Sequence, residues 1–388
     1  MRFSDEARIK FGIFIGPYHR PGINPTLSFQ QDLEIIDQLD RLGFHEAWVG
    51  EHHSGGIESI GDPLLILAAS AERTKHIKLG TGAVTLPWHH PFQIADRIVQ
   101  LSHMTRGRVQ LGVAPGQIVQ DARMMGTDPL RHRQMMEESL DCIVRLLKGE
   151  TVTHKADWFT LYRARLQLLP YNDFDVCVVS GVSPNAPYST GRVGGNMLSV
   201  AATDPTGIEA LAGQWKIMED TYAEFGHGSP DRAGWRLLGP MHIAPTYEQA
   251  LEEVRFGFSQ IEDYRGRIHP QAKGPDYYDF EKTVEHFNES GAAVIGTPEM
   301  ARNQIRRLLD RSGGFGTYLL MGVDWANHDD TLRSHRLFAQ EVMPHFDGTL
   351  APMTRSYEDA MATGFEGADI TAQAQKLSAE RYASRSRA

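Results

Sequence analysis

Short apolar runs and longer amphipathic segments alternate along the chain. Eight runs of strand type can be distinguished, and each is followed by a segment whose apolar residues recur at helical spacing. In residues 27–43, for example, Leu33, Ile36 and Leu39 share one helical face, and Gly43 stands where a C-terminal cap glycine belongs. The eight strands are expected at residues 10–16, 45–53, 77–87, 108–116, 175–181, 196–203, 235–244 and 316–324.

This alternation predicts parallel strands that are joined by right-handed helical crossovers. An open sheet that binds dinucleotides would carry a GxGxxG turn after its first strand. The first strand here gives FGIFIGPYHRPG, in which Pro17 and His19 break that pattern. We therefore predict an α/β protein whose fold is a (β/α)₈ TIM barrel with insertions.

Two insertions and one extension are expected in addition to the barrel. Residues 151–170 have the pattern of a β-hairpin. Residues 259–292 are polar and contain Gly and Pro, which predicts a mobile loop or lid with some helix. Residues 346–388 lack strong periodicity and are expected to form a peripheral C-terminal extension or an oligomerisation arm. The barrel domain is thus assigned to residues 1–345.

Composition restricts the class of protein. The chain has 388 residues, of which 41% are hydrophobic and 23% charged, as in a globular enzyme rather than a disordered chain. A net charge of −10 without a long basic run argues against nucleic acid as a partner. No apolar run reaches the roughly 18 residues that span a bilayer, and the first residues lack the apolar core of a secretion signal. We therefore expect a cytoplasmic protein without membrane contact, in which Cys142 and Cys177 are reduced core thiols.

Histidines gather at the predicted strand ends, where barrel enzymes carry their active sites. They are His19, His52, His53, His89 and His90. Any one of them could be a structural or solvated histidine, but as a group they suit proton transfer near neutral pH. Adjacent residues on a strand point to opposite faces, so His52 and His53 cannot easily bind one metal ion, and no metal is expected.

Two other segments favour a flat, phosphorylated cofactor. Small residues from Gly80 to Ala83 would let a planar ring lie against the backbone, although they would equally serve barrel packing. Residues 180–185 run Ser-Gly-Val-Ser-Pro-Asn into a predicted helix, and the backbone N–H groups of a helix N-terminus can bind an anion. A flavin mononucleotide combines a planar ring with a phosphate and fits both segments.

Four strings carry a resemblance to a known family. They are EAWVGEHHS (46–54), HIKLGTGAVTLPWHHPFQIAD (76–96), LSHMTRGRVQLGVAPG (101–116) and MGTDP (125–129). With these strings in this order, the chain resembles the luciferase-like flavin-dependent monooxygenases. The resemblance implies a barrel that receives reduced FMN (FMNH2) from a separate NAD(P)H-dependent flavin reductase. It also implies O2 as co-substrate, a small apolar substrate, and assembly as a homodimer or homotetramer.

The resemblance assigns roles by position. His52 matches the catalytic histidine, which handles protons at the flavin, and Glu51 precedes it as in the family. Gly82 and Ala83 match the pair beneath the isoalloxazine ring, where a cis peptide bond is typical. The other cofactor-binding positions are Asp121 near the flavin edge and Val182, Ser183 and Asn185 on the phosphate-binding turn.

The chain also departs from the family pattern. Luciferase has a phosphate-binding arginine where this chain has Pro115, and a reactive cysteine where it has Ala114. The phosphate would then be held by Arg192 or by backbone amides. The candidate substrate-pocket residues, each of which could also be core or rim packing, are Tyr18, Trp88, Met124 and Trp325.

Three strings favour one reaction within the family. HHSGG (52–56), LPWHHP (86–91) and WRLLGPMHIA (235–244) resemble segments of members that epoxidise terpene-like alkenes, so this reaction is favoured. Baeyer–Villiger insertion and other apolar substrates, such as alkanes, aldehydes, ketones and thioethers, stay open. A deazaflavin-dependent hydride-transfer oxidoreductase of the same superfamily and a non-catalytic partner subunit of a luciferase-like heterodimer remain alternatives. The EHH string favours the oxygenase over both. A metal-dependent barrel hydrolase is a further alternative and would require bound metal.

Overall fold

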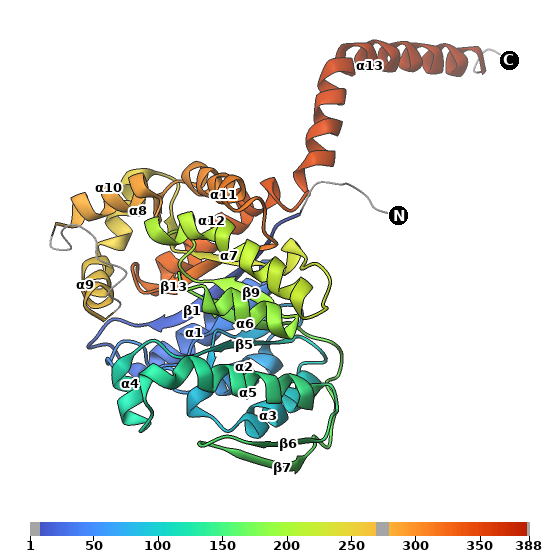
Figure 1. Ribbon diagram of the computed structural model, residues 1–388. Helices are drawn as coiled ribbons and strands as arrows, with labels where there is room; N and C mark the ends of the chain where they lie inside the picture. Colours follow the sequence, from blue (N-terminus) through green and yellow to red (C-terminus); the bar gives the residue numbers. More distant parts are fainter. Residues whose placement is uncertain (1–7, 269–278, 386–388) are drawn as a thin grey trace. The chain divides into compact units, whose positions relative to one another are not determined.

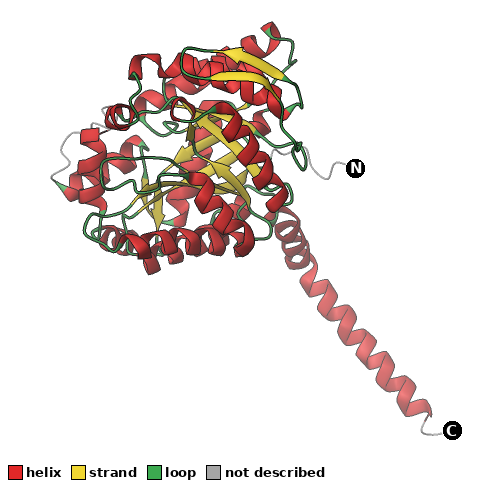
Figure 2. Ribbon diagram, turned by 90° about the horizontal axis from the view of Figure 1, so that it is seen from below, coloured by secondary structure: helices red, strands yellow, loops and turns green. Residues whose placement is uncertain are grey.

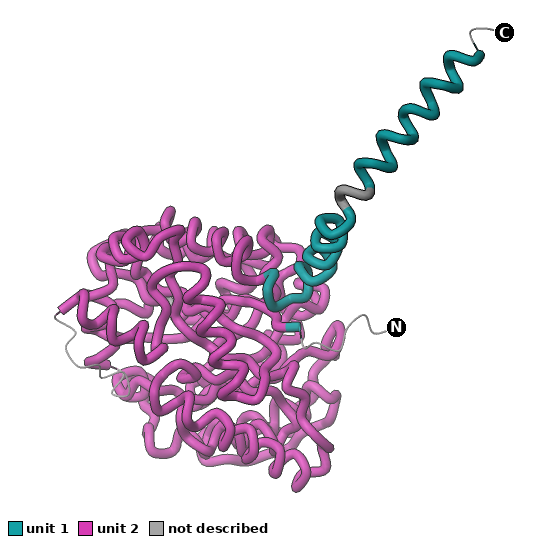
Figure 3. Tube along the Cα trace, turned by 90° about the horizontal axis from the view of Figure 1, so that it is seen from above, with its two compact units in different colours: residues 1–8, 344–388 teal, residues 9–343 magenta. Residues whose placement is uncertain are grey.

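The computed structural model describes residues 8–268 and 279–385. The chain divides into two compact units, of which the larger comprises residues 9–343 and the smaller residues 1–8 and 344–388 (Figure 3). The larger unit contains every strand of the described residues and the candidate site.

The larger unit is a closed barrel of eight parallel strands with helices around it (Figure 1). The strands pair in the order β3, β2, β1, β13, β10, β9, β8 and β5, and β5 pairs with β3 to close the ring. The predicted (β/α)₈ TIM barrel is therefore confirmed. The strands are β1 (Lys10–Tyr18), β2 (Glu46–Val49), β3 (Lys78–Thr81), the short β4 (Val84–Thr85), β5 (Val109–Ala114), β8 (Val176–Ser180), β9 (Asn196–Ser199), β10 (Arg236–Gly239) and β13 (Thr317–Val323).

Helices surround the barrel (Figure 2), and some of them begin at a residue whose side chain caps the first turn. Asn24 accepts a hydrogen bond from the N–H of Thr26 at 3.0 Å, and Asp62 accepts one from Leu64 at 2.9 Å. The covering helices are α1 (Pro25–Arg41), α2 (Pro63–Arg73), α3 (Pro91–Met104), α4 (Val119–Met124), α5 (His132–Leu147), α6 (Asn185–Val193), α7 (Pro205–Glu224), α8 (Tyr247–Val254), α11 (Pro298–Ser312) and α12 (His328–Glu341).

A buried ion pair lies inside the barrel. Arg236 on β10 lies 3.0 Å from Glu46 on β2, and Trp48 donates its indole N–H to the same carboxylate at 2.9 Å. Trp48 fills the barrel interior, and a Cβ atom on Gly80 would lie 2.5 Å from its ring. The small residue at position 80 therefore serves barrel packing, which was one of the two roles considered from the sequence.

The insertions follow the predictions only in part. β6 (Val152–Lys155) and β7 (Thr160–Ala164) form the expected antiparallel hairpin. The expected strand at 235–244 is split at Pro240, which has no N–H to donate. Its second half, β11 (Met241–Ile243), pairs with β12 (Val294–Gly296) in a separate parallel sheet that the sequence analysis missed.

The insertion at 259–292, expected as a loop or lid with some helix, is helical over most of the residues that the structure describes there. They form α9 (Phe258–Ile268) and α10 (Phe280–Ser290), and residues 269–278 lie outside the described residues. Both helices are amphipathic, because Phe258 and Ile261 on α9 and Val284 and Phe287 on α10 are buried in one apolar cluster. The polar residues between these positions hid the helical spacing.

The smaller unit is dominated by one long helix, α13 (Leu350–Arg385), of 36 residues. Its described side chains are exposed to solvent, and its sequence shows no sustained apolar stripe. Over residues 8–268 and 279–385, no helix combines the length and apolar character needed to cross a bilayer. Cys142 and Cys177 are both buried and not in a disulfide.

Candidate active site

The carboxyl ends of the barrel strands surround a cavity of about 310 Å³. This is where barrel enzymes place their active sites, and the volume lies at the lower end of the range for ligand sites. Its walls include the segments that follow β1, β2, β3, β5 and β8. Apolar side chains from the strands line its inner part: Phe14, Val178, Val179, Val200, Leu238 and Met321.

His52 lies between two carboxylates at the edge of this cavity. Its Nδ1 lies 3.2 Å from Oδ2 of Asp121, and its Nε2 lies 3.0 Å from Oε2 of Glu58. Burial disfavours the charged imidazole, but the hydrogen bond to Asp121 and the charges of Glu58 and Asp121 outweigh this and raise the pKa of His52. His52 therefore holds its proton more strongly than an ordinary histidine.

Asp121 lies behind His52 rather than in the cavity wall. Its carboxylate is buried and also accepts a hydrogen bond from the hydroxyl of Ser54. Burial would raise the pKa of Asp121, but the hydrogen bonds from His52 and Ser54 lower it. The residue expected at the flavin edge is thus placed to orient His52.

Glu51 lines the cavity, but its carboxylate is fully engaged by neighbours. It accepts hydrogen bonds from the Thr85 N–H at 2.8 Å, from His53 at 3.0 Å and from His89 at 2.6 Å. Burial raises the pKa of Glu51, and the bonds from His53 and His89 more than offset this. Glu51 thereby fixes the segment that follows β3, and the geometry favours a positioning role.

The expected convergence of five histidines is only partly right. His52 lines the main cavity, whereas His53 and His89 are turned to Glu51. His90 is exposed and lies edge-on to Phe159. His19 belongs to a second cavity, which is described below.

The Gly82–Ala83 segment is placed as expected. The peptide bond between the two residues is cis, and both residues line the cavity. A Cβ atom on Gly82 would lie 2.8 Å from the Phe14 ring, so only glycine fits there without displacement. The wall at this point is therefore low and flat.

The opposite part of the cavity can receive an anion. Val182, Ser183 and Asn185 line it, and α6 begins there. Its N-cap residue Pro184 offers no side-chain hydrogen bond, and the N–H of Asn185 makes only a long contact of 3.4 Å with the hydroxyl of Ser183. Arg192 is not available for this task, because it lies 2.9 Å from Asp141 and donates to the carbonyl of Glu137.

Arg133 supplies the cation that the sequence analysis missed. It is the second residue of α5, it lines the cavity, and it is exposed. Within the described residues, its guanidinium makes no hydrogen bond or ion pair. Its position in the sequence could have revealed it, because Arg133 lies at the start of the long helix after β5, and such helices begin near the mouth of the barrel.

Of the four candidate pocket residues, only Tyr18 lines the main cavity. Trp88 packs edge-on against His53, with the ring centroids 5.3 Å apart. Met124 is 59% exposed on the outer face of the short helix α4. Trp325 is buried and donates its indole N–H to Glu262 at 2.9 Å. Trp88 and Trp325 therefore pack against neighbouring side chains, whereas Met124 lies on the surface.

Helix α9 adds two residues to this region that the sequence did not reveal. Arg265 lines the cavity and lies 3.0 Å from Glu262, so its charge is balanced within the helix. Tyr264 donates its hydroxyl to Oε1 of Glu58 at 3.1 Å. Asp204, at the start of α7, lines the same side, and burial raises its pKa. This side of the cavity is therefore polar.

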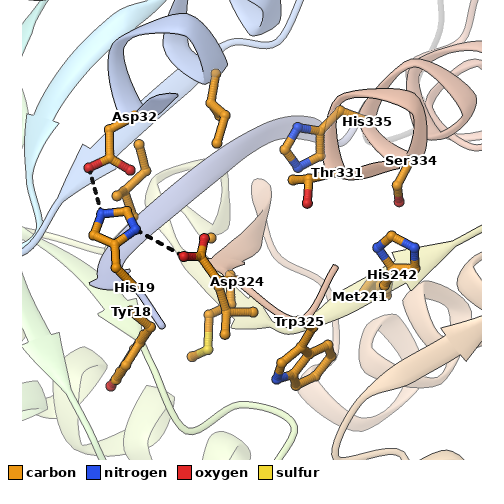
Figure 4. A pocket seen from close by; sticks show the side chains of 15 residues that line it. Tyr18, His19, Asp32, Met241, His242, Asp324, Trp325, Thr331, Ser334 and His335 are labelled. Atoms are coloured by element: carbon orange, nitrogen blue, oxygen red, sulfur yellow. Dashed lines mark hydrogen bonds and ion pairs between the residues drawn. The ribbon is translucent and has the colours of Figure 1, made fainter. Parts of the chain in front are cut away.

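A second, much smaller cavity of about 30 Å³ lies beside the end of β1 (Figure 4). There His19 lies between Asp32, at 3.0 Å, and Asp324, at 3.2 Å. Burial opposes the protonation of His19, but its bonds to the two carboxylates outweigh this and raise the pKa of His19 to about 10. The cavity has room for about one water molecule, so the cluster is structural.

A closed barrel with its candidate site at the carboxyl ends of the strands is a fold that many enzyme classes share, so the class of enzyme comes from the comparisons with known proteins. The chain matches the family described as "Luciferase-like monooxygenase" over residues 9–314 and belongs to that family. It is accordingly a monooxygenase. The resemblance to this family that the sequence strings carry is therefore confirmed.

Two relatives and two solved structures illustrate the match. The chain is 48% identical to limonene 1,2-monooxygenase of Rhodococcus erythropolis over 97% of both sequences. It is 40% identical to 4-hydroxyprotoasukamycin monooxygenase of Streptomyces nodosus subsp. asukaensis, over 90% of this chain and 95% of that protein. Monooxygenase RslO1 of Streptomyces bottropensis has the same fold, with a TM-score of 0.75 at 22% identity, and covers 87% of this chain and 100% of its own. The oxygenating constituent of 3,6-diketocamphane monooxygenase of Pseudomonas putida was solved in complex with FMN. It matches with a TM-score of 0.69 at 21% identity, and the match covers 87% of this chain and 98% of that one.

Proposed function

We propose that the main cavity binds reduced FMN, supplied by a separate NAD(P)H-dependent flavin reductase, and that the protein uses O2 to oxygenate a small apolar substrate. One observation carries this proposal. The Gly82–Ala83 segment, His52 and the N-terminus of α6 at Asn185 all line a single cavity. The FMN in the structure of the diketocamphane relative supports the choice of cofactor.

The residues of the cavity fit this cofactor at both of its ends. The isoalloxazine ring would lie against Gly82 and Ala83, whose side chains are no larger than a methyl group. The phosphate would be bound by the first N–H groups of α6, by Ser183 and by the guanidinium of Arg133. When bound, reduced FMN supplies the electrons that activate O2.

The chain itself contributes proton handling and a dry substrate space. His52 holds a proton on an imidazole that Asp121 orients through Nδ1, which leaves the Nε2 edge on the side of Glu58 and the cavity. The apolar inner wall, which includes Phe14, Val179 and Leu238, excludes water from the reacting atoms. We infer that oxygen transfer at this site depends on the proton of His52.

The substrate that we propose is a terpene-like alkene, which the enzyme would epoxidise. The inner wall offers apolar surface without a specific hydrogen-bonding partner, which suits a hydrocarbon. The name of the 48% identical relative points to the same substrate class. A cyclic ketone is the second candidate, because other relatives are named for diketocamphanes.

The decisive experiment supplies the purified protein with reduced FMN, O2 and a panel of cyclic alkenes and ketones. We expect an oxygenated alkene, no product with a reduced deazaflavin, and activity of the chain without any partner oxygenase subunit. The variant His52→Ala should bind FMN but release hydrogen peroxide in place of product. Full coupling in that variant would refute the role of His52, and hydride transfer from the deazaflavin would favour the alternative oxidoreductase.

Light scattering of the same preparation would test the expected homodimer or homotetramer.

A further inference from the structure

Glu58 is a buried carboxylate in the cavity wall to which the family resemblance assigns no role. It is 2% exposed and lies in the segment between β2 and α2. Two backbone hydrogen bonds hold this segment, from His52 to Ile60 at 3.0 Å and from His19 to Ile57 at 3.1 Å. Glu58 itself forms an antiparallel bridge with Tyr18. The position of its carboxylate is therefore fixed by the backbone on both sides.

The two oxygens of Glu58 join His52 to helix α9. Oε2 lies 3.0 Å from Nε2 of His52, and Oε1 accepts the hydroxyl hydrogen of Tyr264 at 3.1 Å. His52 is in turn bonded through Nδ1 to Asp121. A continuous series of polar contacts thus runs from α9 through Glu58 and His52 to α4.

We propose that Glu58 and Tyr264 are positioning residues that keep His52 protonated and oriented toward the cavity. This inference rests on the proposed proton-handling role of His52. With carboxylates at both ring nitrogens, His52 can satisfy both neighbours only as an imidazolium, which donates from each nitrogen. The hydroxyl of Tyr264 donates to the other oxygen of Glu58 and so holds this carboxylate beside Nε2 of the imidazole.

The charges around His52 favour this assignment. From its own segment it faces Glu51 and Glu58, and from α4 it faces Asp121. Helix α9 contributes Tyr264 and the cation Arg265, but Arg265 is balanced by its ion pair with Glu262. Three carboxylates therefore face one imidazole, and the amphipathic helix α9, which lies within the insertion, completes the proton-handling site.

The first test measures the protonation of His52 directly in the full chain without flavin. Histidine ring resonances of isotopically labelled protein are followed against pH, and His52→Gln identifies the resonance of His52. In Glu58→Gln the titration midpoint should fall by about one unit or more, because one carboxylate within ion-pair distance is lost. Tyr264→Phe should lower it by less. The control Glu209→Gln, an exposed residue of α7, should leave it unchanged. An unchanged midpoint in Glu58→Gln would overturn the proposal.

The second test measures coupling with reduced FMN and an alkene across the same pH range. Glu58→Gln should lose coupling at a lower pH than the wild type, while Glu58→Asp, which keeps the charge, should recover part of the difference. If Glu58→Gln does not fold, Tyr264→Phe, which removes one hydroxyl, must still shift the loss of coupling to lower pH, by a smaller amount. Should His52→Ala remain fully coupled, the proposed role of His52 in oxygenation fails, although the titration shift would stand. If the titration midpoint of His52 is unshifted in Glu58→Gln while His52→Ala is uncoupled, only the proposed role of Glu58 is refuted.

Discussion

The imidazole of His52 and the carboxylate of Asp121 share a hydrogen bond of 3.2 Å between residues 69 positions apart in the sequence. This bond joins the segment after β2 to α4 at the mouth of the barrel. Ser54, two residues beyond His52, donates to the other oxygen of Asp121. The histidine and the carboxylate that orients it are thus held as one rigid pair.

Replacing Asp121 by Asn should lower coupled oxygenation by about tenfold or more, since proton handling by a positioned group contributes roughly 10²- to 10⁴-fold. Loss of the carboxylate also lowers the pKa of His52, so activity should decline at a lower pH than in the wild type. Product yield and hydrogen peroxide, measured from about pH 6 to about pH 9, test both effects. Asp220→Asn, on the exposed face of α7, is the matched control. An unaltered pH profile would show that Asp121 does not act through His52.

Replacing Arg133 by Ala should weaken FMN binding by about 10- to 100-fold, since a hydrogen bond to a charged group contributes about 1.5 to 3 kcal/mol. Riboflavin lacks the phosphate, so its affinity should hardly change. Fluorescence titration with both flavins separates a phosphate contact from general damage. Arg123→Ala, on an exposed face of α4, should affect neither flavin. Equal losses for FMN and riboflavin would show that Arg133 does not bind the phosphate.

The barrel could be predicted from the sequence because its signal is local and repeated. Each strand is a short apolar run, and helices such as α2 begin with a cap residue followed by proline, as at Asp62 and Pro63. The failures arose where tertiary contacts decide the structure. Helices α9 and α10 bury only a few apolar residues, such as Phe258 and Val284, among many polar ones. Their packing partners come from distant segments, which a local pattern does not reveal.

For the site, too, the sequence predicts what local signals determine and misses what tertiary contacts determine. Residues tied to strand ends, such as His52 and Gly82, could be placed because the barrel brings all strand ends to one mouth. Trp88 and Trp325 also follow strands, yet their side chains turn outward, and strand position alone does not give that direction. Tyr264 reaches the site from α9, 206 residues away from its partner Glu58 in the sequence. Such a contact needs the folded structure.

Replacing Gly80 by Ala should destabilise the barrel by about 1 to 3 kcal/mol, the usual effect of overpacking a dense core. The new Cβ would lie 2.5 Å from the ring of Trp48, which is itself held by Glu46 and cannot retreat. Urea unfolding followed by tryptophan fluorescence gives the free energy. Gly213→Ala, in α7, has open space around it and should instead stabilise by about 0.5 to 1 kcal/mol. Equal effects at the two positions would contradict the packing role of Gly80.

Replacing His19 by Gln should destabilise the protein by about 3 kcal/mol near pH 6.5, because the buried carboxylate of Asp32 and the partly buried carboxylate of Asp324 would lose their shared cation. The effect should depend on pH with a definite sign. The pKa of His19 is raised to about 10 in the folded protein, so its stabilising contribution is complete below the unfolded value of about 6.5 and declines as the pH rises toward 10. The difference in the free energy of unfolding by urea between wild type and variant should therefore shrink between these two pH values. His76→Gln, at an exposed position, should show no such trend. A difference that stays constant or grows with pH would show that His19 is neutral between Asp32 and Asp324.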